Sequence, residues 1–425
     1  MFPFSQKKPR FGTCLHRINL WGLIAGMVII FSGCATLQPV DLPDEKALEP
    51  AETEFWTALA TERSGNWFKL LNYGNEAIEW RLRVIDSATR SLDLQTFLWL
   101  EDTTGLMVLR HILDAADRGV RVRILLDDLF TVGESDTILS IDQHPNIEYR
   151  IYNPFGRRYD SIFLREVMNL GEFYRLDHRM HNKVLVADNR TAIIGGRNIA
   201  DEYFGDHLAA NFRDMEVLTA GPVVESISSR FDDYWNNNWS IPADRVLELS
   251  LPEKEPEALM VRLKATIERG LEENHMTSRS MWLSAARSAA SGKASVIADD
   301  PAQKNPAAAN ELPNQLAHAL VKWIDRSNEE LILVSAYLIP TPELEAAIER
   351  AESRGVRVRI LTNSLRSNNH VPAHSFYRNH IERLIGHGAD LHEVRAQAKD
   401  RSIYMRNPVA VSYTHLRAHE TVLVI

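Results

Sequence analysis

Cysteine is scarce in this chain, and its scarcity excludes several kinds of site. The 425 residues include two cysteines, Cys14 and Cys34, and both lie near the N-terminus. The rest of the chain therefore offers no disulfide and no cysteine-based metal site. An excess of positive charge is also missing, because the net charge is −9. A chain with this charge is not built to coat nucleic acid, so we expect no nucleic-acid partner.

Long hydrophobic runs are missing as well. The apolar run from Ile18 to Phe31 follows a basic stretch and is too short to span a bilayer comfortably. It ends in "FSGCA", which resembles a bacterial lipoprotein cleavage site with Cys34 as the acylated residue. We expect residues 1–34 to be a lipoprotein-type signal peptide and residues 35–54 a linker. An uncleaved anchor and an ordinary signal peptide are the alternatives.

An eight-residue sequence occurs twice. "RGVRVRIL" stands at Arg118–Leu125 and again at Arg354–Leu361, each time within a strand–helix–strand pattern. This repeat indicates an internal duplication. Alternating strands and helices predict an α/β fold in which each half has a mostly parallel sheet flanked by helices. The predicted domains are a first half at 55–241, a connecting segment at 242–314 and a second half at 315–410.

The candidate catalytic residues lie in "HNKVLVADNRTAIIGGRN", which begins at His181. Residues 183–187 and 191–194 are typical of two short strands joined by a tight turn. Because His181 and Lys183 are two apart on an extended chain, their side chains point the same way. A hairpin of this kind brings Asn198 back beside them.

This set suits a phosphodiester substrate. His181 can attack phosphorus and carry the phosphoryl group covalently. Lys183 supplies positive charge for the phosphate oxygens, and Asn198 can donate a further hydrogen bond. Gly195 and Gly196 let the backbone approach closely, so we count them as substrate-binding residues.

Two aspartates accompany the set. A carboxylate behind the imidazole would fix its tautomer, and Asp214 is the candidate. Asp188 completes the candidate catalytic residues, although its place between the strands favours capping of the turn. Neither a second histidine nor a carboxylate stands at a metal-ligand spacing from His181, so we expect no metal. The alternative is a surface hairpin with unrelated polar residues.

Arginines crowd the approach to this stretch, and Arg179 stands immediately before it. They either attract anionic lipid headgroups, with Arg179 as a substrate-binding residue, or belong to a solvated loop balanced by acidic neighbours. The residues concerned are Arg157, Arg158, Arg165, Arg175 and Arg179.

The motif resembles the signature of the phospholipase D superfamily, which is His, any residue, Lys, four residues, Asp, six residues, Gly-Gly or Gly-Ser, any residue, Asn. The match covers His181, Lys183, Asp188, the glycine pair and Asn198. Further stretches, among them "YNPFG", "GGRNIADEYFG" and "DMEVLTAGPVV", resemble bacterial cardiolipin synthases of the C type. The resemblance covers roughly residues 55–410.

The resemblance implies a function. The family histidine is a nucleophile, a second histidine from the other half is the general acid, and neither metal nor cofactor is required. The implied activity is phosphatidyl transfer to the alcohol of phosphatidylglycerol or a related phospholipid. The lipoprotein-type N-terminus predicts a place at a membrane, on the periplasmic side of the bacterial envelope. Whether this is the inner or the outer membrane stays open. The alternatives are a phospholipase or nuclease of the same superfamily and a catalytically incomplete envelope lipoprotein.

A second motif is missing from its expected place. The repeat spacing puts it near residue 417, where His415 and Arg417 stand, but Val422 occupies the position of the aspartate and no glycine pair follows. We therefore expect native sequence to stop near Ala410, with 411–425 foreign and the second half incomplete. A single motif suffices where two copies meet in a symmetric homodimer.

Overall fold

The computed structural model describes residues 37–131, 135–159, 161–208, 211–247, 279–301, 315–367, 371–395, 411–412 and 421–424. Cys34 and the predicted signal peptide lie outside these residues, as do most of 242–314 and His415. The chain divides into a unit that ends at Gln38 and a unit that begins at Pro39, and the fold below is that of the second unit. Within the described residues, no helix has the length and apolar character to cross a membrane.

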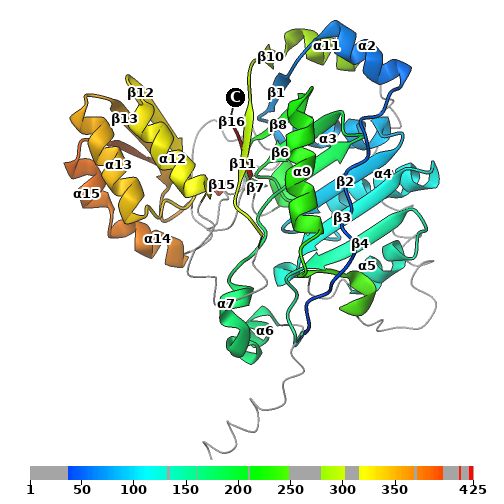
Figure 1. The fold of residues 1–425 in the computed structure, drawn as a ribbon. Coiled ribbons are helices and arrows are strands. Elements are labelled where there is room, and N and C mark those ends of the chain that lie inside the picture. The colour runs from blue at the N-terminus through cyan, green and yellow to red at the C-terminus, as the bar shows by residue number, and fades with distance from the viewer. Residues whose placement is uncertain are drawn as a thin grey trace, which may run out of the picture. The chain divides into compact units, whose positions relative to one another are not determined.

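A nine-stranded mixed sheet forms the first half (Figure 1). Its strand order is β10-β1-β8-β6-β5-β2-β3-β4-β9, in which β2, β3 and β4 run parallel and the other pairs are antiparallel. The strands are β1 Trp67–Leu71, β2 Ser91–Thr96, β3 Arg121–Asp127, β4 Ile147–Tyr152, β5 Val184–Ala187, β6 Thr191–Gly195, β8 Glu216–Ala220, β9 Ser240–Pro242 and β10 Ala290–Ser291.

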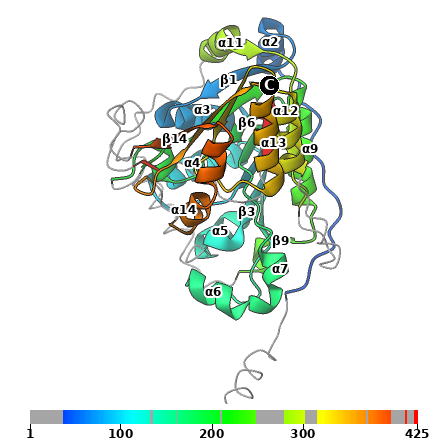
Figure 2. The ribbon, with the colours of Figure 1, turned by 90° about the vertical axis from the view of Figure 1, so that its left-hand side faces the viewer.

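Helices cover both faces of this sheet (Figures 1 and 2). Leu92 and Leu94 of β2 belong to the main core, with Ile112 of α4. The opposite face of β2 and β3 is covered by α9 and holds a buried ion group, in which Arg123 bonds Asp93 and pairs with Asp232 at 2.9 Å. The helices are α2 Glu54–Glu62, α3 Gly74–Ser87, α4 Thr103–Asp117, α5 Ser135–Asp142, α9 Val223–Trp235 and α11 Arg279–Ser288.

The second half repeats the parallel part of the first. Its strands β12 (Glu330–Val334), β13 (Arg357–Asn363) and β14 (Asp390–Val394) form a parallel sheet. Glu330 lies opposite Arg357 just as Ser91 lies opposite Arg121, so the two copies share one register. The predicted duplication and the α/β class are confirmed. The helices here are α12 Gln315–Arg326, α13 Pro342–Ser353, α14 Val371–Arg378 and α15 Ile381–Gly386.

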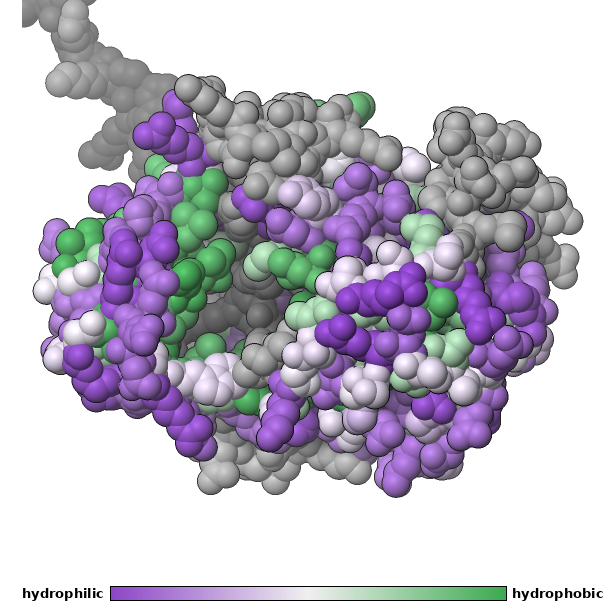
Figure 3. All heavy atoms as spheres, turned by 90° about the horizontal axis from the view of Figure 1, so that it is seen from above, coloured by the Kyte–Doolittle hydropathy of each residue, from purple (hydrophilic) through white to green (hydrophobic). Residues whose placement is uncertain are grey.

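The strand β12 is more exposed than its counterpart β2. Every residue of β2 is buried, whereas side chains of β12 alternate between exposed and half-buried. Ile332 and Val334 are 58% and 49% exposed. Figure 3 shows hydrophobic residues gathered along one side of the part that contains β12–β14.

Short elements complete the fold. The segment between β4 and β5 contains α6 and α7, and α8 follows β6. Two strand pairs, β7–β15 and β11–β16, lie outside both sheets. Their bounds are α6 Ile162–Met168, α7 Phe173–Leu176, α8 Asp201–Phe204, β7 Asn211–Phe212, β11 Ser295–Ala298, β15 Val411–Ser412 and β16 Thr421–Val424, with 3-10 turns at Asp128–Phe130, Leu170–Glu172 and Ala243–Arg245.

Candidate active site

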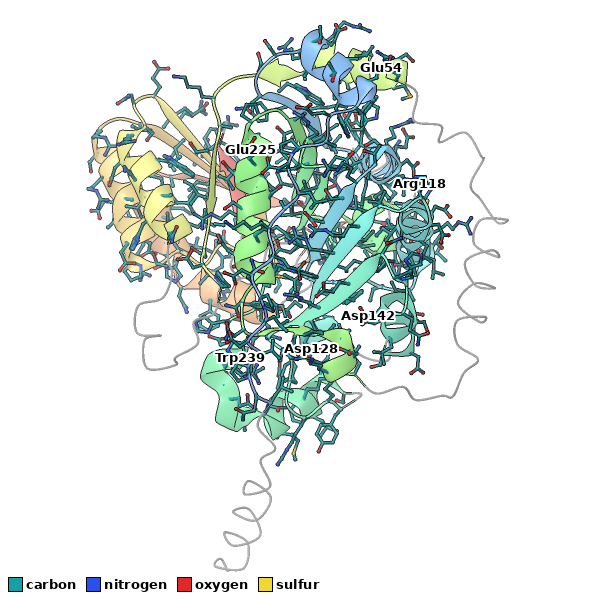
Figure 4. The ribbon with its side chains drawn as sticks, turned by 45° about the vertical axis from the view of Figure 1, so that its right-hand side comes forward. Glu54, Arg118, Asp128, Asp142, Glu225 and Trp239 are labelled. Carbon is teal, nitrogen blue, oxygen red and sulfur yellow. The ribbon has the colours of Figure 1, made fainter. Side chains whose placement is uncertain are left out.

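The candidate residues lie at the carboxyl end of the parallel strands. Strand β5 runs antiparallel to β2, with Val184 opposite Gln95, so the residues just before β5 reach the end of β2. Figure 4 marks this end of β3 with Asp128 and its opposite end with Arg118. The carboxyl ends of strands are where open α/β sheets place ligands.

Phe97 holds the histidine and the lysine together. Its ring lies edge-on to the His181 imidazole at 4.8 Å, and Lys183 Nζ lies 5.3 Å from the centre of the same ring. Lys183 Nζ also donates to the His181 carbonyl oxygen at 2.6 Å. All three side chains are at least 94% buried. Sequence reasoning missed Phe97, although its position directly after a fully buried strand was a usable signal.

Asn198 is fixed at Leu98, the residue that follows Phe97. The hairpin places Gly195 N 3.4 Å from Lys183 O and pairs Val184 with Ile194, as the sequence predicts. Asn198 Oδ1 accepts from Leu98 N at 3.2 Å, and its amide donates to Tyr203 Oη at 2.7 Å. These two bonds fix the orientation of the amide, with its oxygen toward Leu98 N and its nitrogen toward Tyr203 Oη.

The glycine pair lies against β8. A side-chain carbon at Gly196 would come within 2.2 Å of Asp214 Oδ1, and one at Gly195 within 2.4 Å of the Met215 carbonyl oxygen. Gly196 N donates to that same carbonyl oxygen at 3.2 Å. The structure thus shows a close approach between the motif loop and the start of β8, with the Asp214 carboxylate directly over Gly196.

A buried network of ion pairs holds the motif loop against the start of β8. The Arg197 guanidinium donates to backbone oxygens of Leu71 at 2.9 Å and of Asp214. Glu216 pairs with Arg81 and lies 3.7 Å from Arg197. Burial lowers the pKa of Arg197, opposed by the charge of Glu216. The network ties the loop after β6 to β8, because Arg197 belongs to the loop and Glu216 to β8. Removing one of these two side chains would leave the charge of the other unpaired in the interior.

Asp127, at the end of β3, holds the residue that precedes His181. Its carboxylate accepts from Met180 N at 2.8 Å and from Leu129 N at 2.9 Å, and Arg179 Nη1 lies 3.2 Å away. Burial raises the pKa of Asp127 to about 6, against the charge of Arg179. Asp127 was not among the site residues predicted from the sequence. Its bond to Met180 makes it a candidate for positioning His181.

The predicted substrate-binding Arg179 turns inward. It is 9% exposed, and it donates to the Asn153 carbonyl oxygen as well as facing Asp127. Arg158 pairs with Asp128, and Arg175 pairs with Glu172. These arginines thus fasten the β4–β5 connection through internal ion pairs.

Asp188 lies at the far end of the hairpin from His181. It occupies the turn with φ of 55°, and its carboxylate accepts from Trp56 Nε1 at 2.8 Å and from Arg90 N at 2.7 Å. Thr89 and Ser91 donate to it as well. Asp188 therefore ties the turn to the start of β2, which is the capping role that its place between the strands favours.

Within the described residues, no group of three or more histidine, cysteine, aspartate or glutamate side chains is arranged to hold a metal ion. The groups around Phe97 and Leu98 are an imidazole, an ammonium and an amide, with the Asp214 carboxylate against the motif loop. Such a set can attack and bind a phosphate ester.

Comparisons with known proteins point the same way. A family model described as "Cardiolipin synthase, PLD-like domain" matches residues 82–235 and 320–409. Cardiolipin synthase C of Escherichia coli K12 is 33% identical over 339 residues, which are 77% of this chain and 69% of that protein. Cardiolipin synthase B of the same organism is 31% identical over 169 residues, covering 39% of this chain and 37% of the relative.

A solved structure shares the fold. Phosphatidylserine synthase from Haemophilus influenzae Rd KW20 superposes with a TM-score of 0.52 at 14% identity, covering 88% of this chain and 80% of that one. Two proteins of Helicobacter pylori without an assigned function are 30% and 29% identical, and this chain spans 66% of the length of each. The two stretches matched by the family model fall in the two halves that share one strand register.

Proposed function

Since this chain belongs to the phospholipase D family that includes the cardiolipin synthases, we propose that it transfers a phosphatidyl group between phospholipids, in a cardiolipin-forming reaction. The observation that carries the proposal is the shared contact of His181 and Lys183 with Phe97. It holds a nucleophile and a cation side by side at the strand ends.

In the first step an imidazole nitrogen of His181 attacks the donor phosphorus. The bond from phosphorus to the leaving headgroup oxygen breaks, and a general acid returns a proton to that oxygen. In the second step the conjugate base of that general acid takes the proton of the acceptor hydroxyl. The acceptor oxygen attacks the phosphohistidine, the bond from phosphorus to nitrogen breaks, and His181 is freed. Lys183 and Asn198 bind the phosphate oxygens and stabilise their negative charge in both steps. Asp214 orients the imidazole and stabilises its cationic form.

We also propose where the reaction takes place. Long-chain phospholipids reside in membranes, and a lipid anchor at Cys34 would keep the chain at one, on the periplasmic side of the bacterial envelope.

The test is His181→Ala in the full chain, with His178→Ala as the matched control. Vesicles of labelled phosphatidylglycerol serve as substrate, and cardiolipin is separated from phosphatidic acid. We expect His181→Ala to lower transfer by about a thousandfold or more, because the covalent route is lost. The His178 control should retain activity. Undiminished cardiolipin formation in His181→Ala refutes the role, and phosphatidic acid as the sole product identifies a hydrolase.

A further inference from the structure

Helix α6 exposes three apolar side chains at its start while it buries an arginine. Ile162, Phe163 and Leu164 are 36%, 70% and 44% exposed, Val167 and Met168 are half-buried, and Arg165 is 3% exposed. Asn169, one turn later, is 5% exposed. The residues that follow continue the pattern, with Leu170 and Phe173 exposed by 53% and 58%. A helix on a protein surface normally buries its apolar face, so the exposed side of this one is suited to a non-aqueous surrounding.

The inward polar side chains are firmly bonded. Arg165 donates to the carbonyl oxygens of Tyr159 at 2.6 Å, Asp128 at 3.2 Å and Thr131 at 3.1 Å. Asn169 accepts from Arg157 N at 3.0 Å and donates back to Arg157 O at 2.9 Å. Rolling the helix over to hide its apolar residues would break these buried bonds, and each unpaired group is costly. The apolar side chains are therefore held outward.

The outward side chains form a small patch next to the candidate active site. The segment that carries them starts after β4 and ends at His181. Arg165 pairs with Asp128, whose neighbour Asp127 holds Met180 N. Figures 1 and 2 both show α6 and α7 beyond the end of the sheet, apart from the helix layers. We define the patch as Tyr159, Ile162, Phe163, Leu164, Leu170 and Phe173.

We propose that this patch docks onto a phospholipid surface and brings the His181 end of the sheet to it. This inference rests on the proposed function, since a phospholipid substrate lies in such a surface. The place of the patch favours lipid over a protein partner, because the segment that carries it leads directly to His181, whose proposed substrate is a phospholipid. Helices at a membrane surface bury their exposed apolar side chains in the headgroup boundary of the bilayer.

The first experiment measures partitioning of the full chain onto vesicles of phosphatidylethanolamine and phosphatidylglycerol. Cys14→Ser and Cys34→Ser are introduced throughout, so that no acyl anchor contributes. Phe163→Gln and Phe173→Gln are each expected to lower the partition coefficient about tenfold. Phe376→Gln is the matched control, because Phe376 lies in the second half and is 58% exposed, like Phe173. Equal partitioning of all three variants and the parent overturns the proposal.

A second experiment separates this proposal from the proposed function. Transfer is measured on vesicles and on short-chain phosphatidylglycerol below its micellar concentration. We expect the ratio of the two rates to fall about tenfold in Phe163→Gln and to stay unchanged in Phe376→Gln. If the parent protein binds vesicles through the patch but transfers no phosphatidyl group, the proposed function is wrong and the docking role of the patch stands. If Phe163→Gln transfers with an unchanged ratio of the two rates, the docking role is wrong and the proposed function stands. If sedimentation shows that the parent is a dimer and Phe163→Gln a monomer, the patch binds a second copy of the chain and the lipid proposal is wrong.

Discussion

Replacing Gly196 by alanine should disable the site through Asp214 while leaving the protein folded. The added carbon would lie 2.2 Å and 2.5 Å from the two carboxylate oxygens of Asp214. An ordinary contact between such atoms is about 3.4 Å or more, so the carboxylate must retreat by about 1 Å. Its own backbone is held by Arg197, so the side chain has to give way.

The size of the effect follows from that displacement. A shift of about 1 Å in a group that orients a catalytic residue can cost about a hundredfold in rate. Overpacking of this kind lowers the free energy of unfolding by about 1–3 kcal/mol. We therefore expect a folded Gly196→Ala protein, with phosphatidyl transfer reduced about a hundredfold.

The assay is cardiolipin formation on vesicles, with urea unfolding as a check on stability. Gly386→Ala is the control, because a side-chain carbon there meets no atom within 4 Å. A double-mutant cycle with Asp214→Ala identifies the cause. If the clash with Asp214 is responsible, Gly196→Ala should add little to the loss already caused by Asp214→Ala. Full activity in Gly196→Ala, or losses that multiply in the double variant, would refute the reasoning.

Two further predictions concern the other aspartates. Asp188→Ala leaves several buried donors unpaired and should lower the free energy of unfolding by about 4 kcal/mol in urea, yet transfer per folded molecule should stay within about twofold of the parent; a selective loss of activity would return Asp188 to the chemistry. Burial raises the pKa of Asp127 to about 6 from 3.8, so the folded state holds this proton more tightly than the unfolded chain. The stability it provides below pH 4 is lost as the pH rises past 6, by about 3 kcal/mol. Asp127→Asn should remove that part of the pH dependence of urea unfolding, and an unchanged dependence would contradict the assignment.

The repeated sequence was enough to predict the duplicated scaffold. Identical residues in "RGVRVRIL" need the same neighbours, and both copies indeed form the middle strand of a parallel trio in one register. The motif likewise predicted the β5–β6 hairpin, because its apolar alternation and turn residues are local signals. The repeated strands and the hairpin could be predicted because residues close in sequence determine them.

The rest of the site depends on distant partners. Phe97 contacts His181 across 84 positions of sequence, and Asp127 bonds Met180 across 53. No periodicity encodes such pairs. For the same reason, a cluster of arginines in the sequence does not reveal its partners. Asp127 and Asp128, which lie in another part of the chain, face Arg179, Arg158 and Arg165.

The duplication also shows how the two halves diverged. By the shared register, Phe97 corresponds to Ala336, and Asp127 corresponds to Asn363. On the face of the sheet where β2 carries Asp93 and Gln95, β12 carries Ile332 and Val334. Three features thus belong to the first copy alone among these matched positions. They are the Phe97 ring, which contacts His181 and Lys183, the Asp127 carboxylate, which accepts from Met180 N, and the polar face of β2 under α9. The hydrophobic alternation that builds the core, with Leu92 and Leu94 matched by Leu331 and Leu333, was kept in both. Selection for a core preserves a pattern, whereas a site needs particular side chains, so the shared scaffold does not by itself give the second half the chemistry of the first.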